Sequence, residues 1–279
     1  MPPMSERNFN GLLDAQWEAG RFLCVGLDPD LEKIPVAARV EGVRETIVNF
    51  NRAVINATKD IVCAYKPNSA FYEAHGETGW AALQQTIEDV HELAPEVPVI
   101  LDAKRGDIGN TNNGYVAAAF RNLNADALTV HPYMGGESLK EFLTCADKGI
   151  FVMCRNSNPG AGEFQDLDIA GEPLYIHIAK AFGAKWNSNG NCGLVVGATY
   201  PDEIKEVRAI VPEMTFLIPG TGAQGGDLAS SVKNGQRTDG KGFILSTTRA
   251  IVYASDRPDY QEVIRKKAEE FDGAIRAAL

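Results

Sequence analysis

Eight short runs of apolar residues lie along the chain, separated by polar or amphipathic stretches. Each run is short enough for one strand and rich in β-branched residues, and its continuous apolar character predicts burial on both faces. Strands buried in this way are typical of parallel sheets. The runs are FLCVGL from Phe22, IVCAY from Ile61, VPVIL from Val97, ALTV from Ala127, IFVMC from Ile150, GLVVG from Gly193, TFLI from Thr215 and FILS from Phe243.

Helical patterns lie between these runs. Apolar residues recur at helical spacing at Val43, Ile47, Phe50 and Val54, and again at Trp80, Leu83, Ile87 and Val90, where we expect them to face the core. Pro201-Asp202-Glu203 is typical of a first helical turn, and a last helix is expected over Tyr260–Ile275. Eight alternating strand and helix units in 279 residues predict an α/β fold, a (β/α)8 TIM barrel, with a doubly wound sheet as the alternative.

The overall composition fits one domain. A chain of 279 residues, 44% of them hydrophobic, is long enough for a substantial core, and no composition shift marks a boundary. We therefore expect residues 1–279 to form a single (β/α)8 barrel domain.

Charge and cysteine usage restrict the partners and the compartment. A formal net charge of −10 argues against nucleic acid or an anionic membrane as a partner, although a small anion can bind a local basic pocket. The five cysteines include no C-x-x-C pair, which favours a reducing cytosol. Because neither a leader pattern nor a run of roughly 18 apolar residues is present, we expect a soluble, cytoplasmic, unexported protein.

Charged and polar residues follow most of the apolar runs. In a barrel the active site lies at the carboxyl ends of the strands, so these residues are candidates for chemistry. Asp102 and Lys104 are two apart and would share one face of an extended strand, and Lys66 would lie about 5 Å away if strands two and three are neighbours. Asp107 would follow on the next loop or helix start. The strand-end residues are Asp28, Lys66, Asp102, Lys104, Arg155, Asn156, Ser157 and Arg249.

A cluster of alternating lysines and aspartates suits one kind of chemistry. An ammonium flanked by carboxylates stays charged, which makes it a poor Schiff-base nucleophile and a good proton donor beside a developing carbanion. A nearby carboxylate also disfavours a bound substrate carboxylate and so favours loss of CO2. The alternative is an ion-pair network that only closes the top of the barrel.

A second candidate site follows strands seven and eight. Barrels often bind phosphate with these two loops and the start of a short extra helix. In IPGTGAQGGD and STTRAIVYA, four glycines permit close backbone approach, Gln224 supplies amide donors, and Arg249 offers a bidentate guanidinium. The same glycines spell G-x-G-x-x-G, but a dinucleotide fingerprint needs an acid at the end of the next strand, and Asp239 precedes that strand. The glycines are Gly220, Gly222, Gly225 and Gly226.

Two long loops are candidate lids. Residues 155–173 follow strand five and residues 220–241 follow strand seven, and the second is long enough to include a short helix. The four histidines show no ligand spacing, so we expect no catalytic zinc, and His131 is a candidate to line the pocket.

The motif LDAKRGDIGNT matches the D-x-K-x-x-D-I-x-x-T signature of the orotidine 5'-monophosphate decarboxylase family, which the chain resembles from Asp28 to Arg249, with YKPN and SNPGAG in support. The resemblance implies cofactor-free decarboxylation of orotidine 5'-monophosphate to uridine 5'-monophosphate in de novo pyrimidine biosynthesis. It implies that Lys66, Asp102 and Lys104 form the charged network, and that Lys104 protonates the C6 carbanion left when CO2 departs.

The resemblance further implies a homodimer with shared active sites, because Asp107 and Thr111 would reach into the neighbouring subunit. It also implies roles in binding the nucleotide. Asp28 resembles the ribose-binding aspartate, Ser157 resembles the residue that contacts the pyrimidine, and Gln224 and Arg249 resemble the phosphate-binding pair.

The sequence departs from the family pattern at two places, and two alternative functions stay open. Arg105-Gly106 replaces an aromatic-His pair found in many family members, and Asn68 stands where histidine is common. A magnesium-dependent sugar-phosphate decarboxylase or aldolase of the same barrel group shares D-x-K-x-x-D, and loss of activity on chelation would favour it. A catalytically inactive phosphate-ligand binding protein is the other alternative, which an assay for loss of orotidine monophosphate would separate.

Overall fold

The computed structural model describes residues 7–222 and 226–279, and in it the eight apolar runs form one sheet with the order β2-β1-β10-β9-β8-β5-β4-β3. Every neighbouring pair in that order is parallel. The strands are β1 (Leu23–Gly26), β2 (Val62–Lys66), β3 (Ile100–Arg105), β4 (Ala127–Val130), β5 (Gly149–Arg155), β8 (Cys192–Val196), β9 (Thr215–Pro219) and β10 (Phe243–Thr247).

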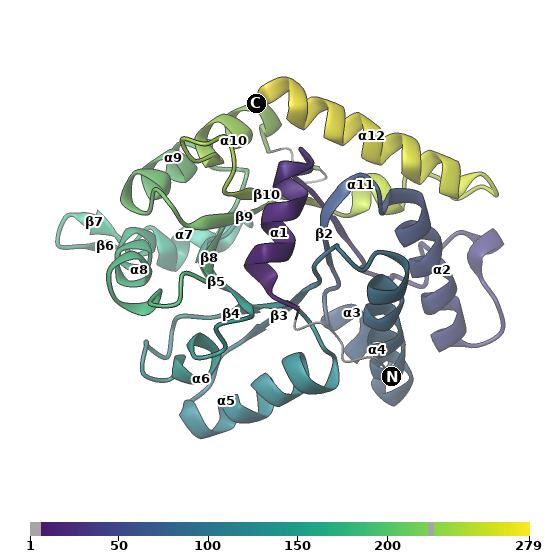
Figure 1. The fold of residues 1–279 in the computed structure, drawn as a ribbon, viewed down its shortest axis with the longest axis horizontal. Coiled ribbons are helices and arrows are strands. Elements are labelled where there is room, and N and C mark those ends of the chain that lie inside the picture. Colours follow the sequence, from purple (N-terminus) through teal and green to yellow (C-terminus); the bar gives the residue numbers. More distant parts are fainter. Residues whose placement is uncertain (1–6, 223–225) are drawn as a thin grey trace.

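Contacts between the two end strands of that order close the sheet into a barrel. The Tyr65 N–H donates to the Pro98 carbonyl at 3.0 Å, and the Asp102 N–H donates to the Pro67 carbonyl at 2.9 Å. Two isolated parallel bridges, Tyr65–Val99 and Asn68–Asp102, join the same edges. The (β/α)8 barrel predicted from the sequence is therefore confirmed, and the doubly wound sheet is not formed (Figure 1).

Helices surround the ring of strands, as Figure 1 shows. The last helix packs against α2 and α10 and completes the outer layer. The longer helices are α2 (Val43–Thr58), α4 (Gly76–Leu93), α5 (Gly109–Val116), α8 (Leu174–Ala181), α9 (Pro201–Ile210), α10 (Leu228–Gly235) and α12 (Tyr260–Ala278). Shorter elements are η1 (Val36–Ala38), α3 (Ala70–Glu73), η2 (Ala117–Asn122), α6 (Lys140–Leu143), η3 (Pro159–Ala161), α7 (Gly162–Gln165), the β6–β7 hairpin (Asp168–Ile169 and Glu172–Pro173), η4 (Phe182–Trp186) and α11 (Arg249–Val252).

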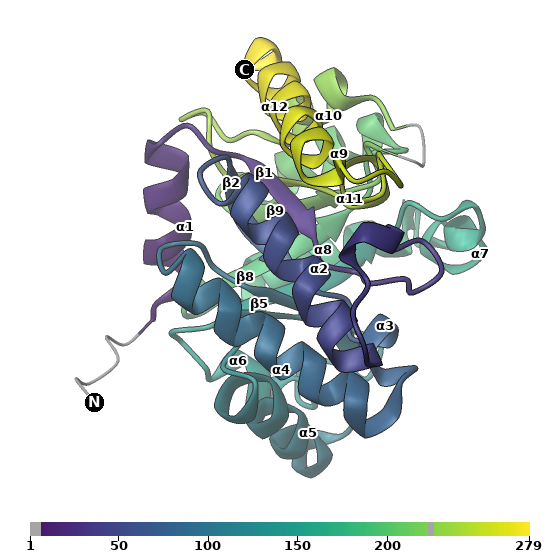
Figure 2. The same cartoon turned by 90° about the vertical axis from the view of Figure 1, so that its right-hand side faces the viewer.

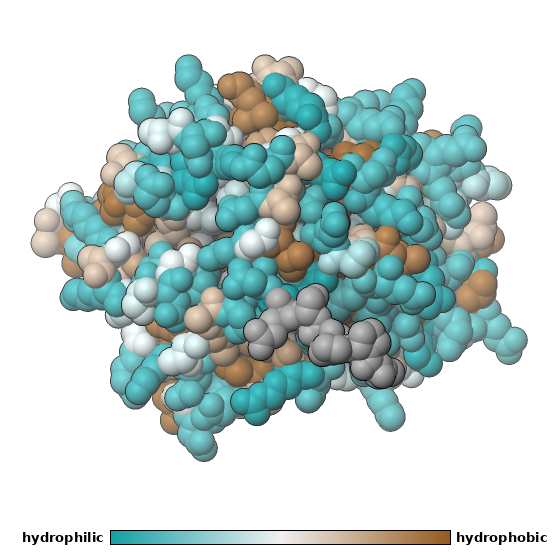
Figure 3. Space-filling view, in the orientation of Figure 1, coloured by the Kyte–Doolittle hydropathy of each residue, from teal (hydrophilic) through white to brown (hydrophobic). Residues whose placement is uncertain are grey.

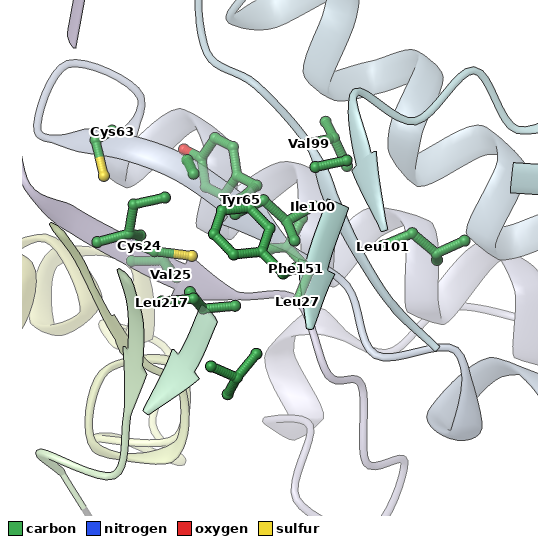
Figure 4. Packing of buried hydrophobic residues seen from close by; sticks show 14 of the residues in the cluster. Cys24, Val25, Leu27, Cys63, Tyr65, Val99, Ile100, Leu101, Phe151 and Leu217 are labelled. Carbon is green, nitrogen blue, oxygen red and sulfur yellow. The ribbon is translucent and has the colours of Figure 1, made fainter. Parts of the chain in front are cut away.

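The strands bury their apolar side chains on both faces because helices cover the outside and side chains fill the inside. Figure 4 shows part of this packing, with Val25, Tyr65 and Phe151 from three different strands. Of the apolar helical residues expected to face the core, Ile47 is buried. Val43 is 38% exposed, because it is the first residue of α2. Burial on both faces explains why the strands read as continuous apolar runs.

An additional helix, α1 (Phe9–Glu18), covers the amino end of the barrel and was not predicted from the sequence, although Phe9, Leu13 and Trp17 recur at helical spacing. Asn8 caps it by accepting a hydrogen bond from the Gly11 N–H at 2.9 Å. The Phe9 ring packs edge-on against Phe151, and the Trp17 indole N–H donates to the Phe243 carbonyl at 3.0 Å. Figure 2 shows α1 and α7 at opposite ends of the molecule, so the carboxyl ends of the strands are left for a site.

The outer surface on the α1 side is largely hydrophilic, with small scattered hydrophobic patches (Figure 3). None of the helices in residues 7–222 and 226–279 is long and apolar enough to cross a membrane.

Arg208 joins the ends of two helices near the amino end of the barrel. Its guanidinium donates to the carbonyls of Met214 at 2.6 Å and Val211 at 3.1 Å after α9, and to the Gly235 carbonyl at the end of α10. The group lies over the Phe216 ring at 3.7 Å. Burial, together with the charge of Arg237, lowers the pKa of Arg208 to about 9. One arginine therefore satisfies helix-end carbonyls that would otherwise lack donors.

We predict that Arg208→Ala lowers the free energy of unfolding by about 3 kcal/mol, because several carbonyls lose a charged donor. Denaturant unfolding measures the change. Arg276→Ala is the control, because the exposed Arg276–Asp272 pair is worth less than about 1 kcal/mol. Equal losses in the two variants would show that Arg208 has no special role.

Candidate active site

Two cavities open at the carboxyl ends of the strands and share Lys66 and Pro219. The Arg249 cavity has a volume of about 350 Å³, and the Lys104 cavity has a volume of about 270 Å³. The Arg249 cavity is lined by residues that include Asp28, Asp30, Lys33, Lys66, Asn68, Gly220, Gly222, Thr247, Arg249 and Tyr253. The Lys104 cavity is lined by residues that include Lys66, Asp102, Lys104, Thr129, His131, Met153, Asn156, Ser157 and Asn158.

The Asp102 carboxylate lies between two ammonium groups. Its Oδ2 is 3.0 Å from Lys66 Nζ, and its Oδ1 is 2.6 Å from Lys104 Nζ. The side chains of Lys66 and Asp102 are each 9% exposed, whereas Lys104 is 41% exposed and faces the cavity. The Thr129 hydroxyl donates to Oδ1 at 2.9 Å. These groups form one connected charged cluster.

The geometry at Lys104 differs from the regular strand alternation that the sequence suggested. The register of β3 against β4 shifts between Leu101 and Arg105, and Lys104 adopts a positive φ of 45°. Its N–H donates to the Thr129 hydroxyl at 2.9 Å. A left-handed conformation is strained for a lysine, so the ammonium reaches Asp102 through an irregular backbone and not through simple alternation.

The cluster fixes the charge of its buried members. Burial would raise the pKa of Asp102, but Lys66 and Lys104 hold it well below its ordinary value. Burial would lower the pKa of Lys66, but the carboxylates of Asp102 and Asp28 raise it above its ordinary value. Both groups are therefore ionised at neutral pH, as a fixed charge array requires.

Asn68 links an aspartate of the Arg249 cavity, Asp28, to an aspartate of the Lys104 cavity, Asp102. The Asn68 N–H donates to Asp28 Oδ1 at 3.1 Å, and the Asn68 side-chain amide donates to Asp102 Oδ2 at 3.4 Å. Burial raises the pKa of Asp28 despite the nearby Lys66. The backbone N–H of Asn68 thus bonds Asp28, and its side-chain amide bonds Asp102 without adding a charge.

The Arg249 cavity collects the loops that follow β9 and β10. Arg249, Gly220 and Gly222 all line it. A Cβ atom at Gly222 would lie 2.5 Å from the Thr247 hydroxyl, so only glycine lets this loop approach β10 so closely. Gln224 and Gly225, which the sequence also assigned to this site, lie outside the described residues.

Sequence reasoning missed a group on the other rim of the Arg249 cavity. The Lys33 ammonium is 2.5 Å from Asp30, and both residues line the cavity. The Tyr253 hydroxyl accepts a hydrogen bond from the Asp30 N–H at 2.6 Å and donates to the Asp28 carbonyl at 2.7 Å. Asp30 and Lys33 gave a weak signal because residues of the loop after β1 show no distinctive spacing, and Tyr253 follows α11.

The Lys104 cavity brings Ser157 and His131 to the same space as the charged cluster. Burial, together with the positive charge of Lys104, lowers the pKa of His131. Asn156, a strand-end candidate from the sequence, also lines this cavity, as do Thr129 and Met153, which were not proposed from the sequence. Alternation along β4 and β5 offered a signal for Thr129 and Met153, because every second residue of a barrel strand faces inward.

Asp107 and Thr111 do not line either cavity of their own chain. Asp107 lies on the loop after β3, where its N–H donates to Asn112 Oδ1 at 3.0 Å, and Thr111 is exposed in the first turn of α5. The neighbouring Arg105 pairs with Glu73 and lies 5.3 Å from the Tyr115 ring. The structure therefore brings Lys66, Asp102 and Lys104 together, and leaves Asp107 and Thr111 outside.

The donor set does not resemble a metal site. Within residues 7–222 and 226–279, no group of three or more His, Cys, Asp and Glu side chains is arranged to hold a metal ion. Both oxygens of Asp102 contact lysine ammonium groups.

Comparison with known proteins gives a consistent family. The sequence model of the orotidine 5'-phosphate decarboxylase / HUMPS family matches residues 21–263. The orotidine 5'-phosphate decarboxylase of Cupriavidus metallidurans is 47% identical over 261 residues, which cover 93% of this chain and 94% of the relative. That of Herpetosiphon aurantiacus is 49% identical over 250 residues, which cover 89% and 90%.

Solved structures of related proteins have the same fold. The OMP decarboxylase of Leishmania donovani superposes with a TM-score of 0.84 at 39% identity, covering 97% of this chain and 98% of that chain. The UMP synthase of the same organism superposes with a TM-score of 0.86 at 42% identity, and this chain corresponds to 56% of it.

We predict that Asp102→Asn lowers the free energy of unfolding by about 3 kcal/mol at pH 7, because Lys66 stays buried without its partner. The folded-state pKa of Asp102 lies below the ordinary value of about 3.9. Its stabilising charge is therefore present above that value and is lost as the pH falls through the folded pKa, so the deficit of the variant shrinks in acid.

Urea unfolding of both proteins at pH 7 and at acid pH measures this deficit. Asp14→Asn is the control, because Asp14 is exposed on α1 and forms no ion pair with another described residue. A deficit that does not depend on pH would contradict the assignment.

Proposed function

The chain belongs to the orotidine 5'-phosphate decarboxylase / HUMPS family, and from this membership we propose how its residues act on the nucleotide. The protein is a lyase that decarboxylates orotidine 5'-monophosphate to uridine 5'-monophosphate in pyrimidine biosynthesis. The observation that carries the residue assignments is the Asp102 carboxylate held between Lys66 and Lys104, in a cavity that joins the Arg249 cavity. The magnesium-dependent alternative is not favoured by the relatives.

The two cavities fit the two ends of a nucleotide. We assign the 5'-phosphate to the Arg249 cavity, where a guanidinium fork and close backbone approach at Gly222 suit a phosphate, and Gln224 would add amide donors. Asp28, beside Lys66 at the junction, would accept hydrogen bonds from ribose hydroxyls. The pyrimidine then lies in the Lys104 cavity, against Ser157.

This placement brings the substrate carboxylate and C6 to the charged cluster. The bond between C6 and the carboxyl carbon breaks, CO2 leaves, and the electron pair stays on C6. Lys104 Nζ then gives a proton to C6 and is reprotonated from water, while Lys66 stays a fixed positive charge. Asp102 would repel the substrate carboxylate and so favour its loss as CO2. No cofactor is needed for these steps.

Asp107 and Thr111 would complete the site of a second copy. Both lie on the segment after β3, and the exposed apolar residues Ile108, Tyr133 and Met134 belong to this and the adjacent segment after β4. Exposed apolar groups beside unassigned polar ones are what a self-complementary interface offers. We assign the protein as a homodimer in which Asp107 and Thr111 enter the partner's active site.

The remaining assignments follow from composition. Residues 1–279 would act as one barrel domain in the cytoplasm. With a net charge of −10, neither nucleic acid nor a membrane surface would be its partner.

We predict that Lys104→Ala reduces kcat for orotidine monophosphate by about 10³-fold or more, because C6 loses its proton donor. The melting temperature should change little, since Lys104 is partly exposed. Loss of the substrate's ultraviolet absorbance measures turnover, and Lys266→Ala on α12 is the control. An active Lys104→Ala enzyme would refute the role of Lys104.

Mixing two inactive variants tests the shared site. Lys104→Ala and Asp107→Ala should each be nearly inactive alone, but their heterodimer contains one site with both native residues. After subunit exchange, activity should recover to about a quarter of the wild-type value, because about half of the dimers are mixed and each has one intact site. If both groups act within one chain, no activity returns.

A further inference from the structure

Arg155, the last residue of β5, is a buried cation that the reaction does not use. Its side chain is 2% exposed, and its guanidinium lies 4.0 Å from the centroid of the Tyr200 ring. The only carboxylate within hydrogen-bond distance in the described residues is Asp166, whose Oδ2 is 3.1 Å from Nη2. Glu203 is 3.7 Å away. Nε and Nη1 have no hydrogen-bond partner among the described residues.

A bulge directs this side chain away from the barrel interior. The register of β5 against β8 shifts between Met153 and Arg155. Met153 faces the Lys104 cavity, whereas the Cys154 thiol contacts the Tyr175 carbonyl of α8. Arg155 would face the cavity in a regular strand, but the extra residue places it against the rings of Tyr200 and, on the helix side of the strand, Tyr175 of α8.

Arg155 is connected to the wall of the cavity through the loop that follows it. Asp166 ends α7, and the preceding Gln165 side chain accepts a hydrogen bond from the Asn156 N–H at 2.8 Å. Asn156, Ser157 and Asn158 line the Lys104 cavity. The loop therefore forms part of the cavity wall directly after β5. Beyond α7 it contacts the end of β5 again, through the Asp166–Arg155 pair and the hydrogen bond between Gln165 and Asn156.

Stability alone does not account for this arrangement. A buried cation with two unpaired donors is costly, and buried ion pairs can often be replaced by apolar side chains without loss of stability. We propose that Arg155 is a positioning residue for decarboxylation, which holds Asp166 so that Asn156 and Ser157 stay against the pyrimidine. This inference rests on the proposed placement of the nucleotide.

Two substitutions separate positioning from support of the fold. Arg155→Met and Asp166→Asn should each lower kcat/KM for orotidine monophosphate about tenfold or more, because the cavity wall is no longer fixed. The melting temperature of Arg155→Met should be unchanged or higher. The inhibition constant of inorganic phosphate should stay constant in both, because phosphate binds in the Arg249 cavity. Arg155→Lys, which keeps the charge, should recover part of the loss.

Glu163→Gln is the matched control, because Glu163 lies on α7 and has no ion pair in the described part of the chain. Asp166 is 48% exposed, so Asp166→Asn decides the outcome if Arg155→Met does not fold. Wild-type kcat/KM in Asp166→Asn would overturn the proposal, as would a parallel loss of melting temperature and phosphate binding. A wild-type protein without activity on orotidine monophosphate would instead refute the function itself.

Discussion

The position of one carboxylate, Asp102, decides whether this barrel has a site. Its two oxygens contact Lys66 on the neighbouring strand and Lys104 on its own strand. Two ammonium groups at this distance would repel each other without the carboxylate, and a buried lysine would tend to lose its proton. Because β2 and β3 meet only where the barrel closes, the fold and the charge array depend on the same contact.

The rest of the molecule leaves that end of the barrel free. Helix α1 covers the amino end, and Arg208 satisfies helix-end carbonyls on that side. Stabilising groups are thus separated from the groups that bind and react, as is usual in this architecture. The irregular backbone at Lys104 is tolerated because the surrounding strands are fully packed.

Much of this could be predicted from the sequence, because buried parallel strands read as apolar runs and their carboxyl ends meet at one edge. The pairing of Lys66 with Asp102 followed from that rule. The left-handed backbone conformation of Lys104 could not be predicted, because it depends on an irregularity of β3 against β4 that residue spacing does not reveal. Helix α1 was missed although Phe9, Leu13 and Trp17 recur at helical spacing, because it precedes the first strand and lies outside the alternation of strands and helices. Asn68 was noticed as a departure, but its bonds to both acids come from tertiary geometry. For Asp107 and Thr111, the information would lie in a second copy of the chain.

The closure of the barrel has a consequence for its dynamics. Most neighbouring strands share continuous registers of three or more residue pairs, and β3 and β4 share two before their register shifts, whereas β2 and β3 are joined only by two isolated bridges. Amide hydrogens along this seam would exchange with solvent sooner than those of β5 and β8. A bound nucleotide that contacts both strands would add interactions between β2 and β3, where the ladder of backbone hydrogen bonds is incomplete. The ligand and the barrel would then stabilise each other.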